Sequence, residues 1–247
     1  QAGPPLAGQV AMLTGASGAI GSSLAEALAR DGADLALVGR DASRLAATAR
    51  LAAAPGRRAT VHQADLTADA DIRRLAADAL REHGGIDILV HAAGDIALGS
   101  TADSPVEAFD RQHQVNVRAA YLLTQLLLAS LRQRHGQIVF VNSSVGLVAK
   151  AGAGPYSATK HALRALADSL RQEVNPDGVR VTSVFPGQTA GALQEGLYRL
   201  AGRAYAPGRL LQPADVAAVA MAALRLPRTA EVTDITVRPL QNPARPG

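Results

Sequence analysis

Short apolar segments alternate with longer segments rich in Ala and Leu along this chain. The apolar segments are continuous rather than alternately apolar and polar, and they lie at residues 10–14, 35–38, 60–62, 88–90, 138–142, 179–185 and 235–237. Continuous apolar runs are typical of strands that are covered on both faces, as in parallel sheets. Helices are expected at residues 20–30, 42–53, 70–82, 117–132, 157–173 and 213–224, with one more that has Pro105 in its first turn. The alternation predicts an α/β fold, in which seven parallel strands form one doubly wound sheet with helices on both faces.

The organisation of the chain indicates a single unit. Its 247 residues contain no linker, repeat or low-complexity segment, and Pro55-Gly56 and Gly84-Gly85 end two of the expected helices. We therefore expect one domain over residues 1–247, with an extended Pro-rich tail at about residues 239–247. In doubly wound sheets, ligands bind beyond the carboxyl ends of the strands. Functional residues are therefore expected directly after the strands.

Composition excludes several classes of protein. Basic residues outnumber acidic ones by 25 to 21, but the two kinds are interspersed and only 3% of the residues are aromatic. This pattern argues against a nucleic-acid partner, which would need a basic patch or a stacking platform. The most apolar helical run, residues 121–131, is shorter than the ~20 residues that cross a bilayer, so no membrane span is expected.

The absence of cysteine narrows the chemistry further. It excludes disulfides, thiolate metal ligands and thiol nucleophiles, and we expect no metal site. The first residues have no basic segment before an apolar stretch, so they do not resemble a secretory signal. We therefore expect a cytoplasmic location.

A glycine-rich turn, residues 14–21, follows the first expected strand and opens the first helix. Small residues let the backbone approach a pyrophosphate, and the helix N-terminus supplies N–H donors. No Gly-Lys-Ser/Thr follows, which excludes a P-loop. The turn therefore predicts dinucleotide binding, although turns of this kind also occur for packing alone.

The end of the second strand indicates which dinucleotide binds. An acidic residue there would bind the ribose hydroxyls of NAD, whereas an arginine can accommodate the 2′-phosphate of NADP. This chain has Gly39 at the acidic position and Arg40 after it. NADP(H) is therefore favoured, with NAD(H) as the alternative if Arg40 only lies on a surface loop. Asp65, after the third strand, is either a solvated loop residue or a contact to the adenine.

The segment Tyr-Ser-Ala-Thr-Lys at residues 156–160 contains the candidate catalytic residues. Tyr156 and Lys160 are four residues apart on a helix and share one face. An ammonium beside a phenol favours phenolate, so we expect the pKa of Tyr156 to be lowered toward neutral pH, as suits a general acid/base. The alternative is an ordinary pair on a helix surface. Ser143 and Ser144 follow the fifth strand, where a hydroxyl can bond a substrate oxygen, and Asn116 lies at a junction of two helices as either a kink or a water-holding site.

Taken together, these motifs resemble those of classical short-chain dehydrogenases/reductases over nearly the whole chain. The resemblance rests on the glycine turn, Asn116, Ser143, the Tyr-Ser-Ala-Thr-Lys segment and the Pro-Gly that follows the sixth strand. It implies a Rossmann-type sheet of seven strands and a Ser–Tyr–Lys–Asn tetrad. It also implies a homodimer or homotetramer, formed through the helices at residues 117–132 and 157–173.

The resemblance assigns a role to each member of the tetrad. Tyr156 would give or take the proton of the substrate oxygen, and Ser143 would orient and polarise that oxygen. Lys160 would hold the nicotinamide ribose and lower the pKa of Tyr156. Asn116 would keep a water that links Lys160 to solvent. The residues expected to contact the cofactor are Gly15, Ser17, Ala19, Ile20, Arg40, Asp65, Leu66, Ala93, Gly94, Tyr156, Lys160, Pro186, Gly187 and Thr189.

Two motifs depart from the family pattern. The fourth strand ends in His91-Ala92-Ala93-Gly94, where the family usually has Asn-Asn-Ala-Gly, and we interpret His91 as a structural histidine. The middle glycine of the classical turn falls at Ala19. The spacing Gly15, Gly18, Gly21 fits the extended branch of the family, but that branch needs a further substrate domain for which this chain has no room.

The expected function is hydride transfer between NADP(H) and a carbonyl or secondary alcohol. The alternative is a non-catalytic sensor of NADP(H) on the same fold. Residues 95–103, 145–155 and 188–211 should wall the substrate pocket, and they favour a small apolar ketone or alcohol, although an arginine could instead grip an acid group. Only two lysines occur among the 25 basic residues; Lys160 has an assigned role and Lys150 is expected to be solvated.

Overall fold

One parallel sheet of seven strands runs through the computed structural model, which describes residues 3–54 and 56–241. The strand order is β3-β2-β1-β4-β5-β6-β7, and every neighbouring pair is parallel. The strands are β1 (Val10–Thr14), β2 (Asp34–Gly39), β3 (Ala59–Gln63), β4 (Ile88–His91), β5 (Gln137–Val141), β6 (Arg180–Pro186) and β7 (Asp234–Val237). The expected doubly wound α/β fold is confirmed. Its switch point lies between β1 and β4, where the chain changes direction across the sheet.

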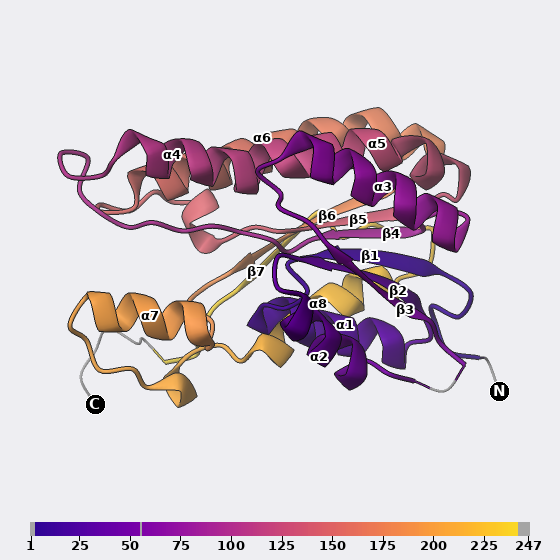
Figure 1. The fold of residues 1–247 in the computed structure, drawn as a ribbon, viewed down its shortest axis with the longest axis horizontal. Helices are drawn as coiled ribbons and strands as arrows, with labels where there is room; N and C mark the ends of the chain where they lie inside the picture. The colour runs from indigo at the N-terminus through magenta and orange to yellow at the C-terminus, as the bar shows by residue number, and fades with distance from the viewer. Residues whose placement is uncertain (1–2, 55, 242–247) are drawn as a thin grey trace.

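Helices cover both faces of this sheet, as Figure 1 shows. One layer contains α3 (Asp69–His83), α4 (Val106–His113), α5 (Ala119–Gln133) and α6 (Gly154–Val174). The other contains α1 (Ala19–Arg30), α2 (Ala42–Leu51) and α8 (Pro213–Leu224), while α7 (Ala192–Leu200) lies at the carboxyl ends of the strands. None of the helices in the described part of the chain is both long and apolar enough to cross a membrane.

The core lies on the two faces of the sheet. Every residue of β1, β4, β5 and β6 is buried, as expected for strands covered on both sides. The edge strands differ, because β3 and β7 alternate between exposed and more buried residues. The expectation of complete cover is therefore wrong at the two edges, where each strand has only one neighbouring strand.

Helix boundaries differ from the sequence expectation in two informative places. Pro105 is the N-cap of α4, with ψ of 142°, rather than a first-turn residue. The helix expected from residue 117 is preceded by a π-helical turn, Gln114–Arg118, which joins α4 to α5. The expected terminator at Pro55 and most of the expected tail, residues 242–247, lie outside the described residues.

Candidate active site

Tyr156 and Lys160 lie on the first two turns of α6, which begins at Gly154 and carries Pro155 in its first turn. Lys160 is buried, and its Nζ lies 5.8 Å from the centroid of the Tyr156 ring. Nζ also donates a hydrogen bond of 3.2 Å to the carbonyl oxygen of Val141, at the end of β5. Burial lowers the pKa of Lys160 to about 8. The expected pair on one helix face is therefore present, and its ammonium faces the sheet.

Ser143 meets the same tyrosine from the end of β5. Its side chain hydrogen-bonds the Tyr156 hydroxyl. The turn that holds Ser143 is fixed by Asn142, whose Oδ1 accepts from the Ser143 N–H at 2.8 Å and whose Nδ2 donates to the Lys160 carbonyl oxygen at 3.0 Å. Sequence reasoning missed Asn142, although a buried amide at the carboxyl end of a strand was the signal available.

The pKa of Tyr156 differs from the expectation. Burial raises it above its ordinary value, and the hydrogen bond from Ser143 opposes this only in part. The predicted lowering by Lys160 is therefore wrong for the chain by itself, because removing the phenolate from water outweighs the other effects. The Tyr156 hydroxyl is protonated at neutral pH and is available to donate a proton.

Asn116 sits in the π-helical turn, and its side-chain amide bonds protein partners through both its oxygen and its nitrogen. Oδ1 accepts from the Asp95 N–H at 2.7 Å, while Nδ2 donates to the Asp95 carbonyl at 2.9 Å and to Thr159 Oγ1 at 3.0 Å. Thr159 Oγ1 in turn donates to the carbonyl of Tyr156 at 2.8 Å. Because both amide hydrogens are engaged, the Asn116 side chain has no N–H left for the expected water. It positions Tyr156 by tying the first turn of α6 to the loop after β4.

The glycine turn brings backbone segments so close together that two of its glycines leave no room for a Cβ atom. Gly15 has φ of +67°, and a Cβ built there would lie 2.6 Å from the Ala93 nitrogen. A Cβ on Gly21 would lie 2.1 Å from the Gly15 oxygen. Helix α1 starts at Ala19 after the N-cap Gly18, which has no side-chain cap, and its first turn contains no acidic residue. Its N-terminal N–H groups and positive dipole end are therefore suited to the pyrophosphate of a dinucleotide.

Arg40 is exposed at the end of β2, beside the same turn. A Cβ built on Gly39 would lie 3.2 Å from Ser17 Oγ and 3.1 Å from the Leu45 side chain. An acidic side chain, which would hydrogen-bond the ribose hydroxyls of NAD, therefore has little room at this position. Arg44 Nη2 donates to the carbonyl oxygen of Ser17 at 2.8 Å. The structure thus brings two arginines and a serine hydroxyl to one corner, a set of groups suited to a phosphate.

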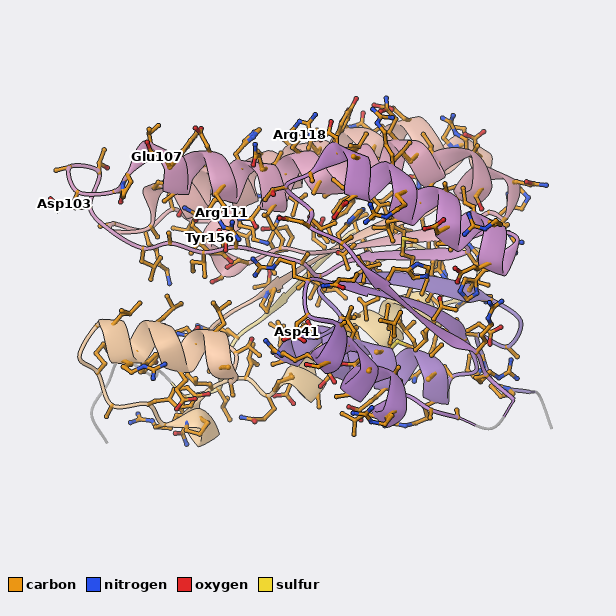
Figure 2. The ribbon with its side chains drawn as sticks, in the orientation of Figure 1. Asp41, Asp103, Glu107, Arg111, Arg118 and Tyr156 are labelled. Carbon is orange, nitrogen blue, oxygen red and sulfur yellow. The ribbon has the colours of Figure 1, made fainter. Side chains whose placement is uncertain are left out.

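Asp41 follows Arg40 and is the N-cap of α2, where its carboxylate accepts from the N–H of Arg44 at 3.0 Å. This hydrogen bond and that from Ser43 lower the pKa of Asp41. Figure 2 shows Asp41 among the lower helices and Tyr156 among the upper ones, on opposite sides of the sheet. A dinucleotide that contacts both regions must cross the carboxyl ends of the central strands.

The segments after β3 and β4 contain residues that we expect to contact the cofactor, and these residues lie in different surroundings. Asp65 Oδ1 accepts from both the N–H and the hydroxyl of Thr67, at 2.9 Å each, and these bonds lower its pKa. Leu66 is buried in the core between the sheet and α3, so its side chain has a packing role. A Cβ built on Gly94 would lie 3.6 Å from Asn116 Oδ1 and 3.9 Å from Lys160 Nζ. Gly94 therefore lies next to Asn116 and Lys160, and its contact to the cofactor stays a prediction.

His91 is a buried structural residue. Its Nε2 is hydrogen-bonded to Thr124 Oγ1 at 2.8 Å, and its ring stacks on Phe140 with centroids 4.9 Å apart. Burial lowers its pKa to about 3, so the imidazole is neutral. This placement agrees with the interpretation made from the sequence.

The segment after β6 approaches the glycine turn from the other side. Gly187 N–H donates to the Val237 carbonyl at 2.8 Å, and Thr189 Oγ1 donates to the Gly187 carbonyl at 3.1 Å. A Cβ built on Gly191 would lie 2.8 Å from the Cβ of Ala19, the first residue of α1. Gly191 therefore lies beside the N-terminus of α1, whose first turn contains Ile20, and Pro186, Gly187 and Thr189 precede Gly191 at the end of β6.

The expected pocket walls carry exposed apolar side chains. Leu98, Val148 and Leu193 are 51%, 68% and 64% exposed and come from the three predicted segments. Two of these segments are joined, because the Gly99 N–H donates to the Gly152 carbonyl at 2.9 Å. The Tyr198 hydroxyl of α7 donates to Gln188 Oε1 at 2.9 Å and so connects α7 to the end of β6.

A doubly wound sheet with an uncapped glycine turn and a Ser–Tyr–Lys constellation defines a dinucleotide-dependent oxidoreductase. The family described as short chain dehydrogenase matches residues 9–199. An uncharacterized oxidoreductase of Staphylococcus saprophyticus is 33% identical over 94% of this chain and 97% of its own. The chain belongs to the short-chain dehydrogenase/reductase family.

Two solved structures share the fold over nearly their full lengths. An alcohol dehydrogenase from the archaeon Thermococcus sibiricus, complexed with 5-hydroxy-NADP, has a TM-score of 0.85 at 29% identity and covers 96% of this chain and 99% of its own. A short chain dehydrogenase from Burkholderia cenocepacia in complex with NADP has a TM-score of 0.83 at 32% identity, with 94% and 97% covered.

Proposed function

We propose that this protein is an NADP(H)-preferring enzyme that interconverts a carbonyl compound and a secondary alcohol. The observation that carries the proposal is the Tyr156 hydroxyl, which is hydrogen-bonded to Ser143 and lies on the same helix face as the buried Lys160 ammonium. A proton donor, a second hydroxyl and a cation meet where the carboxyl ends of the strands leave a ligand site.

The residues present fit a nicotinamide dinucleotide. The uncapped N-terminus of α1 suits the pyrophosphate, and the closed position at Gly39 beside Ser17, Arg40 and Arg44 suits a 2′-phosphate more than free ribose hydroxyls. Two of the related structures bind NADP or a derivative of it, which supports the same preference here. NAD(H) is the alternative cofactor.

In the reduction that we propose, a bound nicotinamide cofactor would supply the hydride that the carbonyl carbon receives. The Tyr156 hydroxyl transfers its proton to the carbonyl oxygen, so the C=O group becomes a CH–OH group. Ser143 donates a hydrogen bond to the same oxygen and orients it. Lys160 stabilises the phenolate left on Tyr156 and holds the cofactor's ribose, and Asn116 keeps the first turn of α6 in place.

The exposed apolar side chains on the three expected pocket walls favour an apolar ketone or alcohol as substrate. The resemblance further predicts a homodimer or homotetramer formed through α5 and α6, and we propose the cytoplasmic location expected from the sequence. We also propose that residues 1–247 act as one domain, because a single sheet extends through the described part of the chain.

A substrate panel tests this function. Small apolar ketones and matched acidic ketones are offered with NADPH and with NADH, and the corresponding alcohols with NADP⁺ and NAD⁺, while the nicotinamide absorbance is followed. We expect turnover with an apolar ketone and a higher kcat/KM with NADPH than with NADH. Tight binding of NADPH without turnover of any carbonyl or alcohol would contradict the proposal and favour a sensor.

A further inference from the structure

A cluster of two histidines and a glutamate joins β3 to the last turn of α3, which is away from the carboxyl ends of the strands. Thr60 and His62 are two residues apart on β3 and point to the same face of the sheet. The Nε2 atoms of His62 and of His83, at the end of α3, each lie 2.8 Å from Thr60 Oγ1. Glu82 Oε2 lies 3.8 Å from His62 Nε2, and one ligand atom of each of His62, Glu82 and His83 lies within 4.8 Å of the other two.

We propose that His62, Glu82 and His83 bind one Zn²⁺ ion. Two imidazole nitrogens and a carboxylate oxygen form a ligand set that Zn²⁺ accepts, with bonds of about 2.1 Å and a fourth position left to water. Such bonds bring tetrahedral ligand atoms to about 3.4 Å from one another, so the cluster must contract. Glu82 and His83 are only partly buried and can make this shift. Thr60 Oγ1, now between the two rings, already faces the Leu35 carbonyl at 3.4 Å and can keep that contact.

The protonation and charge of the surroundings support this site. A metal ion needs neutral imidazoles, and burial lowers the pKa of both His62 and His83. The charged groups that act on the two rings are Glu82, Asp78, Asp34 and Arg58, so carboxylates outnumber the one guanidinium. Arg58 Nη1 donates to the Glu82 backbone carbonyl at 2.6 Å, which directs that cation to the end of α3.

Sequence reasoning predicted no metal site because the chain lacks cysteine. The ligands here are histidines separated by 21 positions along the chain, and only the packing of α3 on β3 brings them together. The ion would tie the end of α3 to an edge strand of the sheet. The site is independent of the proposed redox chemistry.

The experiment uses the full chain after treatment with a chelator. Zn²⁺ is titrated by calorimetry into the wild type, into His83→Ala and Glu82→Gln, and into the control variants His113→Ala and Glu107→Gln, which change exposed residues of α4. Thermal unfolding is recorded with and without excess Zn²⁺. Both variant ligands are partly exposed, so folding should survive, and circular dichroism verifies it.

We expect one Zn²⁺ per wild-type chain, with affinity at least tenfold weaker in His83→Ala and Glu82→Gln and unchanged in the two controls. Saturating Zn²⁺ should raise the Tm of the wild type by about 5 °C or more, and of the ligand variants by much less. Binding that is absent, or equally strong in His83→Ala, would overturn the proposal.

Discussion

The Nζ of Lys160 donates a hydrogen bond to the carbonyl oxygen of Val141, the last residue of β5, at 3.2 Å. This contact holds a buried cation close to the ring of Tyr156, and no carboxylate among the described residues forms an ion pair with it. A compact ammonium can occupy this place and change its protonation state, whereas the wider guanidinium of arginine stays charged. The chain otherwise relies on arginine for positive charge, so the lysine here agrees with the proposed chemistry.

Lys160→Arg should therefore lower kcat/KM by about 100-fold or more, because the guanidinium displaces both the Val141 contact and the ribose that we expect there. Lys150→Arg provides the matched control, since Lys150 is exposed in the loop before α6. Steady-state kinetics with NADPH and the best ketone of the panel measure both. Equal tolerance of the two changes would show that Lys160 has no special role.

The pH dependence of the reaction rate follows from the ionisation of Tyr156 and Lys160. Burial raises the pKa of Tyr156, so its hydroxyl keeps the proton that reduction consumes, and Lys160 holds its charge below a pKa of about 8. We expect kcat/KM for reduction to be level below pH 8 and to fall as the pH rises above it. Alcohol oxidation needs the phenolate, whose small population grows with pH while Lys160 stays charged, so oxidation should become faster as the pH rises toward 8. Reduction that accelerates with rising pH would be inconsistent with Tyr156 as the acid.

Arg40→Ala tests the proposed choice of cofactor. Loss of the guanidinium at the end of β2 should raise the KM for NADPH by about tenfold or more, since a charge-assisted contact to a phosphate contributes about 1.5–3 kcal/mol. The KM for NADH should change little, and Arg57→Ala, in the loop before β3, is the control. An unchanged KM for NADPH would refute the assignment of Arg40.

His91 predicts how stability responds to acid. Its pKa is lowered to about 3 by burial, while the unfolded chain takes up a proton at an ordinary pKa of 6.5. The unfolded state therefore binds more protons between pH 6.5 and 3, and stability falls as the pH drops through this window. At pH 5 the free energy of unfolding is about 2 kcal/mol lower than at neutral pH because of this residue.

The variant His91→Asn removes this titration and keeps a polar partner for Thr124. Urea unfolding at pH 7 and pH 5 should show that the wild type loses about 2 kcal/mol more than the variant between the two values. His113→Asn, on the exposed surface of α4, is expected to behave as the wild type. The same pH response in His91→Asn and in the wild type would contradict the burial argument.

Much of the fold could be predicted because it depends on periodicity. The continuous apolar runs of β1 and β5 and the glycine turn before α1 each indicate a local structure that the sheet then retains. A junction of two helices was predicted at Asn116, but its π-helical form and its hydrogen bonds to Asp95 and Thr159 were not, because these bonds join segments that are distant in sequence. The raised pKa of Tyr156 was missed for a similar reason, since burial is a property of the packed chain.

The measurement that tests this account most directly compares the wild type with Tyr156→Phe. The two differ by one hydroxyl, the group that bonds Ser143 and that we propose gives its proton to the substrate oxygen. With the best carbonyl substrate and saturating NADPH, kcat should fall by about 10²–10⁴-fold, while the dissociation constant of NADPH, measured by fluorescence, stays within about twofold. A phenylalanine variant that keeps wild-type turnover would contradict the central claim.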